Sequence, residues 1–286
     1  MVFDDFLHIN LADIATTPLG AEVGFGVDRK LLIESEGVWF PVLVHISKRF
    51  NSRLLVMYNG AVDRKRSKSG LVFQRSSWVE DFNATRVHFA DPTILDFPEM
   101  SIGWGQLSKE RWGIEVYVEI LNELRKALLL PSAGRTLHYG SSAGGHQAIM
   151  AAVLDRGSRC LANNPQTDIT KYWPGHQARL YENIFRDDSV GTQTLKEMPW
   201  RLKCVEQFRK QGYVPPLEIV TNINSSRDFD RQFIPFIRAM NGLEPSKNSV
   251  TFEGYWDPEG GHRALGRRDT SIRINRTLNR FDAELS

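Results

Sequence analysis

The stretch from Thr136 to Leu154 constrains the fold of this chain more than any other, because an apolar run passes into a helical run through small residues alone. Its first residues, TLHY, favour a buried strand, and residues 145–154 favour a helix. The link between them reads GSSAG. A strand that turns this tightly into a helix is typical of a layered α/β protein, in which such turns lie at the carboxyl edge of the sheet.

Strand and helix candidates alternate along the rest of the chain. The strand candidates are short apolar runs, most of which end in glycine, asparagine or aspartate: 54–58, 86–90, 136–139, 160–162, 217–221 and 250–252. Helical periodicity is found at 112–130, 145–154, 229–240 and in the C-terminal tail. This order predicts an α/β fold with a mainly parallel central sheet and helices on both faces.

Two regions fit the alternation less well. Residues 1–50 are expected to be β-rich, because they contain two apolar runs separated by the turn-like pair Glu36-Gly37. Residues 166–200 are rich in aromatic and charged side chains. We interpret them as a lid-like insertion after a central strand, with an ordinary long connection carrying its own helix as the alternative. The whole chain, 1–286, is expected to form a single domain.

Composition excludes several classes of protein. Of the 286 residues, 41% are hydrophobic and 24% are charged, as in ordinary globular proteins, and the formal net charge of +2 gives no overall bias toward nucleic acid. The two cysteines have no CxxC spacing, which argues against a disulfide framework or a zinc cluster. The N-terminus is acidic, and no window approaches the ~20 apolar residues of a membrane span. We therefore expect a cytoplasmic protein with no nucleic-acid partner and no membrane span.

The tight turn carries a candidate nucleophile. Gly140, Ser142 and Gly144 match the pattern G-x-S-x-G, in which glycines avoid collisions around a strained serine. The hydroxyl is then held above the sheet edge, and the N–H of Ala143 points toward incoming negative charge. Ser141 competes, but the glycine spacing favours Ser142. The alternative is a glycine-rich turn without chemistry, such as a phosphate-cradling loop, although no Lys-Ser/Thr pair follows it.

With this motif in its strand–helix context, the chain resembles the α/β-hydrolase superfamily over roughly residues 50–286. The resemblance implies a triad in the chain order serine, acid, histidine. His262 follows paired glycines after the last strand candidate, and those glycines let the imidazole approach the serine. The loop after residues 217–221 supplies the acid, for which we prefer Asp228 and keep Asp230 as the alternative.

The resemblance also implies an oxyanion hole with two N–H donors. Ala143 is expected to supply one donor. The other comes in this family from the loop after an earlier strand, here Asn59-Gly60-Ala61, so either Gly60 or Ala61 is the second donor. This loop departs from the H-G-G-G form of many lipases, and the choice between the two residues stays open.

Substrate candidates follow in the same loop and in the insertion. The loop continues with four basic residues, Arg64, Lys65, Arg66 and Lys68. They form either a solvated loop or a lip that attracts an anionic substrate such as an acidic sugar, a phosphate or coenzyme A. Trp173 could stack on a sugar ring or simply pack. The stretches NPQTD and FADP, with a later Gly-Trp pair, resemble hydrolase-fold proteins associated with bacterial surface-glycan assembly.

Three functions are consistent with these residues. In the first, a serine hydrolase cleaves a small-molecule or glycan-borne carboxylic ester, as an esterase or deacetylase: Ser142 attacks, His262 moves the proton and Asp228 orients the ring. In the second, the same residues transfer the acyl group to an acceptor hydroxyl. Neither needs a metal or an organic cofactor. The third is a non-catalytic component of a glycan-assembly or secretion complex, disfavoured because every triad position is filled.

Overall fold

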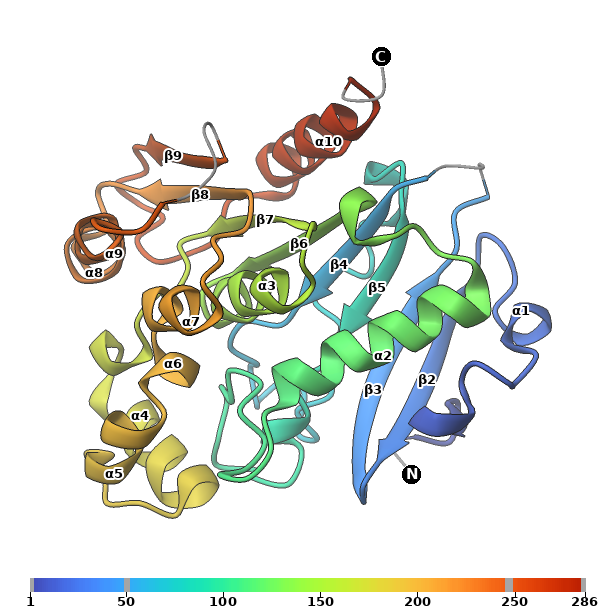
Figure 1. The fold of residues 1–286 in the computed structure, drawn as a ribbon, viewed down its shortest axis with the longest axis horizontal. Coiled ribbons are helices and arrows are strands. Elements are labelled where there is room, and N and C mark those ends of the chain that lie inside the picture. The colour runs from blue at the N-terminus through green and yellow to red at the C-terminus, as the bar shows by residue number, and fades with distance from the viewer. Residues whose placement is uncertain (1–2, 49–51, 245–248, 284–286) are drawn as a thin grey trace.

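The computed structural model describes residues 3–48, 52–244 and 249–283 (Figure 1). Within these ranges the strands form one nine-stranded sheet in the order β1-β2-β3-β5-β4-β6-β7-β8-β9. The strands are β1 (Leu7–Asn10), β2 (Asp28–Ser35), β3 (Val38–His45), β4 (Leu54–Tyr58), β5 (Thr85–Phe89), β6 (Thr136–Ser141), β7 (Arg159–Asn163), β8 (Leu217–Asn222) and β9 (Val250–Tyr255).

The sheet is mainly parallel, as predicted. Only β3 runs antiparallel to its neighbours β2 and β5, and every other pair of adjacent strands is parallel. The middle strands β4, β5, β6 and β8 are buried along their whole length. Of these four, β4 is a continuous apolar run, as expected for a buried parallel strand, whereas the others also bury polar side chains such as Arg86, His138 and Glu218. Because β4, β6, β7, β8 and β9 run in one direction, the turns that follow them meet at the same edge of the sheet.

Helices cover both faces of this sheet. These helices are α2 (Gly113–Leu128), α3 (Ala143–Leu154), α7 (Cys204–Gln211), α9 (Ile234–Ala239) and α10 (Arg267–Ala283). Helices α2, α3 and α7 pack on one face around the largest apolar cluster, whereas α10 packs on the other face with its own cluster (Figure 1). Helix α3 is buried at every position from Ala143 to Val153, so it forms the centre of its layer. The predicted α/β architecture is therefore confirmed.

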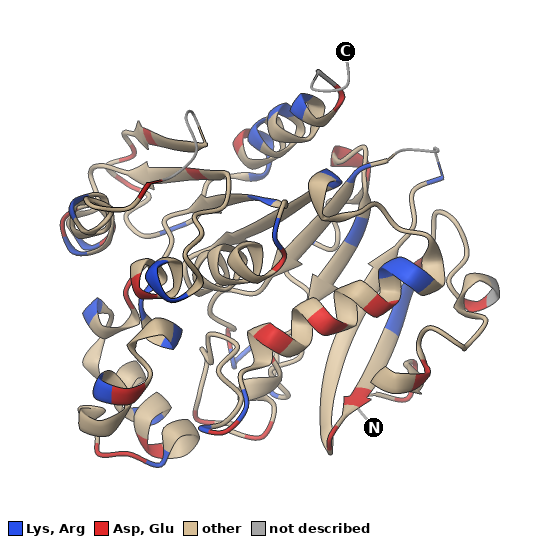
Figure 2. Cartoon of the chain, viewed as in Figure 1, with Lys and Arg blue, Asp and Glu red and all other residues tan. Residues whose placement is uncertain are grey.

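Shorter elements complete the chain. They are α1 (Leu19–Glu22), α8 (Ser226–Asp228), the 3₁₀ helices η1 (Leu11–Asp13), η2 (Val79–Asp81), η3 (Pro92–Ile94) and η4 (Ala133–Arg135), and the π turn η7 (Phe229–Phe233). Charged side chains lie mostly on the helices and loops, and the central strands carry few of them (Figure 2). None of the helices in the described ranges combines the length and apolarity needed to cross a bilayer.

The segment between β7 and α7 is built from short helical pieces. They are η5 (Ile169–Lys171), α4 (Pro174–Leu180), the π turn η6 (Tyr181–Phe185), α5 (Thr192–Glu197) and α6 (Pro199–Leu202). Their apolar side chains form a second cluster around the buried indole of Trp104. In Figure 1, α4 and α5 are gathered away from β8 and β9. The segment thus shares a core with Val62, Ile94 and Trp104 from earlier loops, and it delivers residues 166–173 toward the sheet edge.

Candidate active site

Ser142 occupies a strained turn between β6 and α3. Its φ of 57° and ψ of −124° are unusual for a residue with a side chain, and such strain is concentrated at functional sites. The two motif glycines make the turn possible. A Cβ on Gly140 would lie 2.0 Å from the carbonyl oxygen of Gly144, and one on Gly144 would lie 2.6 Å from the carbonyl oxygen of Tyr58. The helix begins at Ala143, two residues before the predicted start, because the serine directly precedes it.

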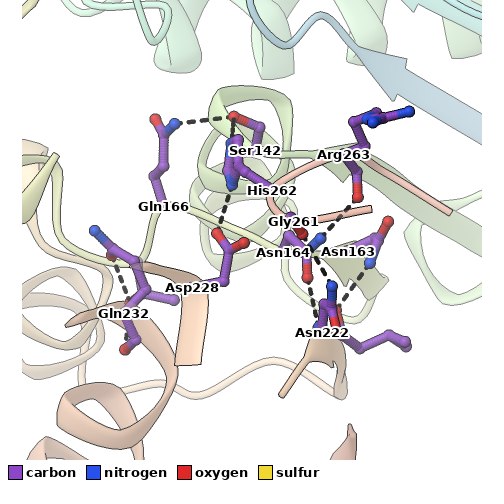
Figure 3. Close-up of polar contacts among 12 residues, drawn as sticks. Ser142, Asn163, Asn164, Gln166, Asn222, Asp228, Gln232, Gly261, His262 and Arg263 are labelled. Carbon is purple, nitrogen blue, oxygen red and sulfur yellow. Dashed lines mark hydrogen bonds and ion pairs between the residues drawn. The ribbon is translucent and has the colours of Figure 1, made fainter. Parts of the chain in front are cut away.

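Three side chains meet at this turn, as Figure 3 shows. The Oγ of Ser142 is 2.8 Å from Nε2 of His262, and Nδ1 of His262 is 2.5 Å from Oδ1 of Asp228. The side chain of Asp228 is 2% exposed and that of His262 is 30% exposed. Asp230, the alternative acid, is exposed, and the carboxylate that contacts the imidazole among the described residues is that of Asp228. The arrangement can take a proton from the hydroxyl and hold the resulting imidazolium against a buried carboxylate.

The loop that carries His262 is fixed by two buried asparagines. Nδ2 of Asn222 donates to the carbonyl oxygens of Asp257 and Gly261, at 2.8 and 3.0 Å, and its Oδ1 accepts from the N–H of Asp257. Asn164 accepts from the N–H of Asn222 and donates to the carbonyl oxygen of Arg263 (Figure 3). The base is therefore anchored to the ends of β7 and β8 on both sides of its position.

Gln166 contacts the serine directly, and sequence reasoning assigned it no role. Its Nε2 donates to Oγ of Ser142 at 2.9 Å, and its Oε1 accepts from Nε1 of Trp104. Because an indole nitrogen can only donate, this bond fixes which end of the amide faces the serine. Its main-chain N–H also donates to the carbonyl oxygen of Ser142. In the sequence, Gln166 was marked only by its place in the stretch NPQTD, and that stretch did not indicate which residue it contacts.

The buried ring of His146 contacts the main chain of Gln166. Nδ1 of His146 is 2.9 Å from the carbonyl oxygen of Gln166, and Nε2 is 3.3 Å from that of Arg201. Burial lowers the pKa of His146 to about 4, so the ring is neutral at pH 7. Burial likewise raises the pKa of Tyr172, whose ring lies 6.2 Å from that of His262. His146 and Tyr172 are therefore both uncharged at pH 7.

The loop after β4 lies against the serine turn. A Cβ built on Gly60 would be 3.8 Å from Cβ of Ser142. The N–H of Gly60 is already bound to Oε1 of Gln74 at 2.9 Å, and Nε2 of Gln74 donates to the carbonyl oxygen of Ala61. In the part of the chain that the structure describes, no acceptor is bound to the N–H of Ala61. Of the two candidate donors in this loop, Ala61 is thus the one with a free N–H.

Ser141, the competing serine, faces a different environment. Its hydroxyl accepts a hydrogen bond from Nη2 of Arg75 at 2.8 Å, and it is buried. The guanidinium of Arg75 also lies over the rings of Trp78 and Tyr139. An arginine cannot act as a base, so Ser141 has no proton acceptor comparable to His262.

The basic residues of this loop divide into two groups. Arg64 turns inward and donates to the carbonyl oxygens of Met100, Lys68, Ile94 and Phe97. Its guanidinium holds the loop together through these four carbonyl contacts. Lys65 and Arg66 are exposed. Burial, which the sequence did not reveal, separates the anchoring arginine from its solvated neighbours.

Trp173 is the last residue of the stretch 166–173, which passes close to His262. Its side chain is exposed, and the guanidinium carbon of Arg227 lies 3.3 Å from the centre of its ring. It directly follows Tyr172, which faces His262. Among the described residues, no group of three or more His, Cys, Asp or Glu side chains is placed to hold a metal ion.

No protein-family profile and no curated protein sequence matches this chain. Solved structures do. S-formylglutathione hydrolase from Agrobacterium tumefaciens superposes with a TM-score of 0.61 at 16% identity, over 92% of this chain and 97% of that one. This chain has the α/β-hydrolase fold.

Two further structures have the same fold. The capsule O-acetyltransferase of Neisseria meningitidis serogroup A superposes with a TM-score of 0.57 at 12% identity, over 91% of this chain and 97% of that one. Prolyl oligopeptidase B from Galerina marginata superposes with a TM-score of 0.58 at 15% identity, over 89% of this chain and 36% of that one. At these identities the likeness establishes the architecture, and chemistry has to be argued from the site.

Proposed function

We propose that this protein is a serine hydrolase that cleaves a carboxylic ester through an acyl-enzyme. The observation that carries the proposal is the continuous hydrogen-bonded chain from Ser142 through His262 to Asp228. His262 takes the hydroxyl proton as Ser142 attacks the carbonyl carbon, and it returns the proton to the leaving alcohol. Water then repeats the sequence on the acyl-enzyme. Asp228 holds Nδ1–H and stabilises the imidazolium.

The oxyanion hole is proposed to consist of the N–H groups of Ala143 and Ala61. Ala143 opens α3, so its N–H has no partner within the helix and adds to the positive end of the helix dipole. Ala61 is preferred to Gly60 because Gln74 occupies the N–H of Gly60. Losing one such donor typically slows an enzyme by ~10²–10³-fold.

Gln166 is proposed to aim the nucleophile. The oxygen of Ser142 directs its proton to His262 and accepts one hydrogen bond from Gln166. A hydroxyl oxygen has two lone pairs, so one remains for the substrate carbon. The amide also donates to the oxygen as negative charge develops there, when hydrogen bonds are about twice as strong. The segment 166–200 is proposed as the lid-like wall of this site.

Acyl transfer to a sugar hydroxyl is the second candidate. The likeness to a capsule O-acetyltransferase motivates it, and the exposed ring of Trp173 beside the proposed site suits stacking on a sugar. Lys65 and Arg66 could attract an anionic glycan. A non-catalytic role in a glycan-assembly complex is less favoured, because such a role needs no aligned triad. We further propose that residues 1–286 form a single domain, since all described strands share one sheet.

Hydrolysis of p-nitrophenyl acetate tests the proposal. The wild type should show saturable turnover and an initial burst of p-nitrophenol, and folded Ser142→Ala should show neither. Turnover by Ser142→Ala equal to that of the wild type would refute it. Adding methyl glucoside, or in a parallel reaction methyl glucuronide, separates ester hydrolysis from acyl transfer. O-acetyl sugar detected by mass spectrometry indicates transfer, and acetate alone indicates hydrolysis.

A further inference from the structure

A polar cavity lies away from the serine turn, beside the amino-terminal end of β5. Its volume is about 320 Å³, and its lining includes His45, Lys48, Glu80, Asn83 and Arg86. Arg86 is the second residue of β5 and pairs with His45 of β3. The catalytic turn lies at the carboxyl ends of the parallel strands, so the two sites are at opposite edges of the sheet.

Arg86 is the unusual residue of this cavity. It is 1% exposed, and its Nε and Nη1 have no hydrogen-bond partner among the described residues. Buried arginines are normally paired, because a desolvated charge without partners destabilises the folded state. Arginine also remains charged under physiological conditions, so it cannot escape this cost by losing its proton. The guanidinium therefore calls for an acceptor that the described residues do not provide.

The neighbouring groups make the cavity suitable for an anion. Lys48 adds a second cation to its lining. Asp28, a carboxylate near Arg86, is bound to Nδ1 of His45 at 2.8 Å. Burial, and then the charge of Arg86, lowers the pKa of His88 to about 3; this residue lies on the same face of β5. Glu80, an exposed residue, is the carboxylate in the lining, and it would compete with a bound anion.

We propose that this cavity binds a small anion with two adjacent oxygens, a carboxylate or phosphate group, and that Arg86 is its principal ligand. The planar guanidinium matches such a group with two parallel N–H···O bonds. Lys48 supplies a second charge from the rim. The site is independent of Ser142, and its occupancy stabilises the folded protein by mass action.

The test is calorimetric titration of the full chain with inorganic phosphate and, separately, with malonate, against sodium chloride at equal ionic strength. Saturable binding of either anion is expected, and the anion that binds tighter identifies the source of the oxygens. Arg86→Met should weaken binding at least tenfold while leaving the rate of Ser142 labelling by a fluorophosphonate unchanged. The matched control, Glu80→Gln, should bind at least as tightly as the wild type.

Three results would overturn the proposal. The first two are phosphate or malonate affinity no higher than that of chloride, and anion affinity in Arg86→Met equal to that of the wild type. The third is a lower melting temperature of Glu80→Gln, which would show that Glu80 is the partner of Arg86. If Arg86→Met does not fold, Lys48→Ala replaces it in the titration. That variant should weaken phosphate binding at least threefold, and unchanged affinity would contradict the proposed site.

Discussion

Replacing Gln166 by methionine tests how the nucleophile is aimed. Methionine is unbranched and of similar length, so it removes the amide while largely keeping the packing. The structure predicts two separate losses. Ser142 loses the hydrogen bond from Nε2, and Nε1 of Trp104, a fully buried residue, loses its acceptor. The first loss affects reactivity and the second affects stability.

The magnitude of the first loss follows from the change in charge on the serine oxygen. A hydrogen bond to a neutral group contributes about 0.5–1.5 kcal/mol, and one to a charged group about 1.5–3 kcal/mol. The difference, about 1 kcal/mol or slightly more, is available only as the proton leaves Ser142. Because 1.4 kcal/mol corresponds to about tenfold in rate, Gln166→Met should react about five- to tenfold more slowly. The unpaired indole of Trp104 should reduce the free energy of unfolding by about 1–3 kcal/mol.

The assay is the second-order rate constant for fluorophosphonate labelling, measured beside urea unfolding of the same preparation. Trp104→Phe is the matched control, because it releases the amide but keeps its contact with Ser142, and its labelling rate should fall less. A folded Gln166→Met protein that reacts at the wild-type rate would refute the role of Gln166. A lower stability with an unchanged rate would reduce Gln166 to a structural residue.

Three further predictions follow from the site. Asp228→Asn should lower the labelling rate of Ser142 by about 10⁴, because an amide favours the wrong tautomer of the base, and a folded variant with wild-type labelling would contradict the triad. Asn222→Ala should lower that rate by ~10- to 100-fold, since misplacing a base by about 1 Å has such an effect; an unchanged rate would show that the loop needs no anchor. His146 has a folded pKa of about 4, below its unfolded value near 6.5, so its contribution to stability is complete above pH 6.5 and is lost as the pH falls toward 4. Urea unfolding should therefore show about 2 kcal/mol less pH dependence between pH 7 and 5 in His146→Gln than in the wild type, and equal pH dependence would exclude a buried neutral ring.

The sequence predicted best those strands that end at a recognisable turn or motif. The strand at 54–58 has the bounds that were expected, because a buried parallel strand is a continuous apolar run that ends at a turn. Ser142 was selected by its motif, and Asp228 and His262 by the chain order that the α/β-hydrolase resemblance implies. Each follows a strand candidate, and parallel strands bring such places to one edge. That reasoning depends on chain order and needs no knowledge of side-chain contacts.

The residues that support the site could not be found in this way. Asn222 and Gln166 act through hydrogen bonds to residues at least 24 positions away in the chain. An uncharged amide has no characteristic spacing or titration that marks such a role. Arg64 illustrates the same limit for charged residues. Four basic residues within five positions suggest a solvated patch, and only the fold reveals which one turns inward to bind carbonyl oxygens.

The central claim is that the hydroxyl of residue 142 is the activated nucleophile. Peptide mass spectrometry after fluorophosphonate treatment measures this directly, because it locates the phosphonylated side chain. We expect one adduct, on the tryptic peptide that contains Ser142, and its loss in Ser142→Ala. A folded wild-type protein that carries the adduct on another serine, Ser141 included, or that carries no adduct at all, would contradict it.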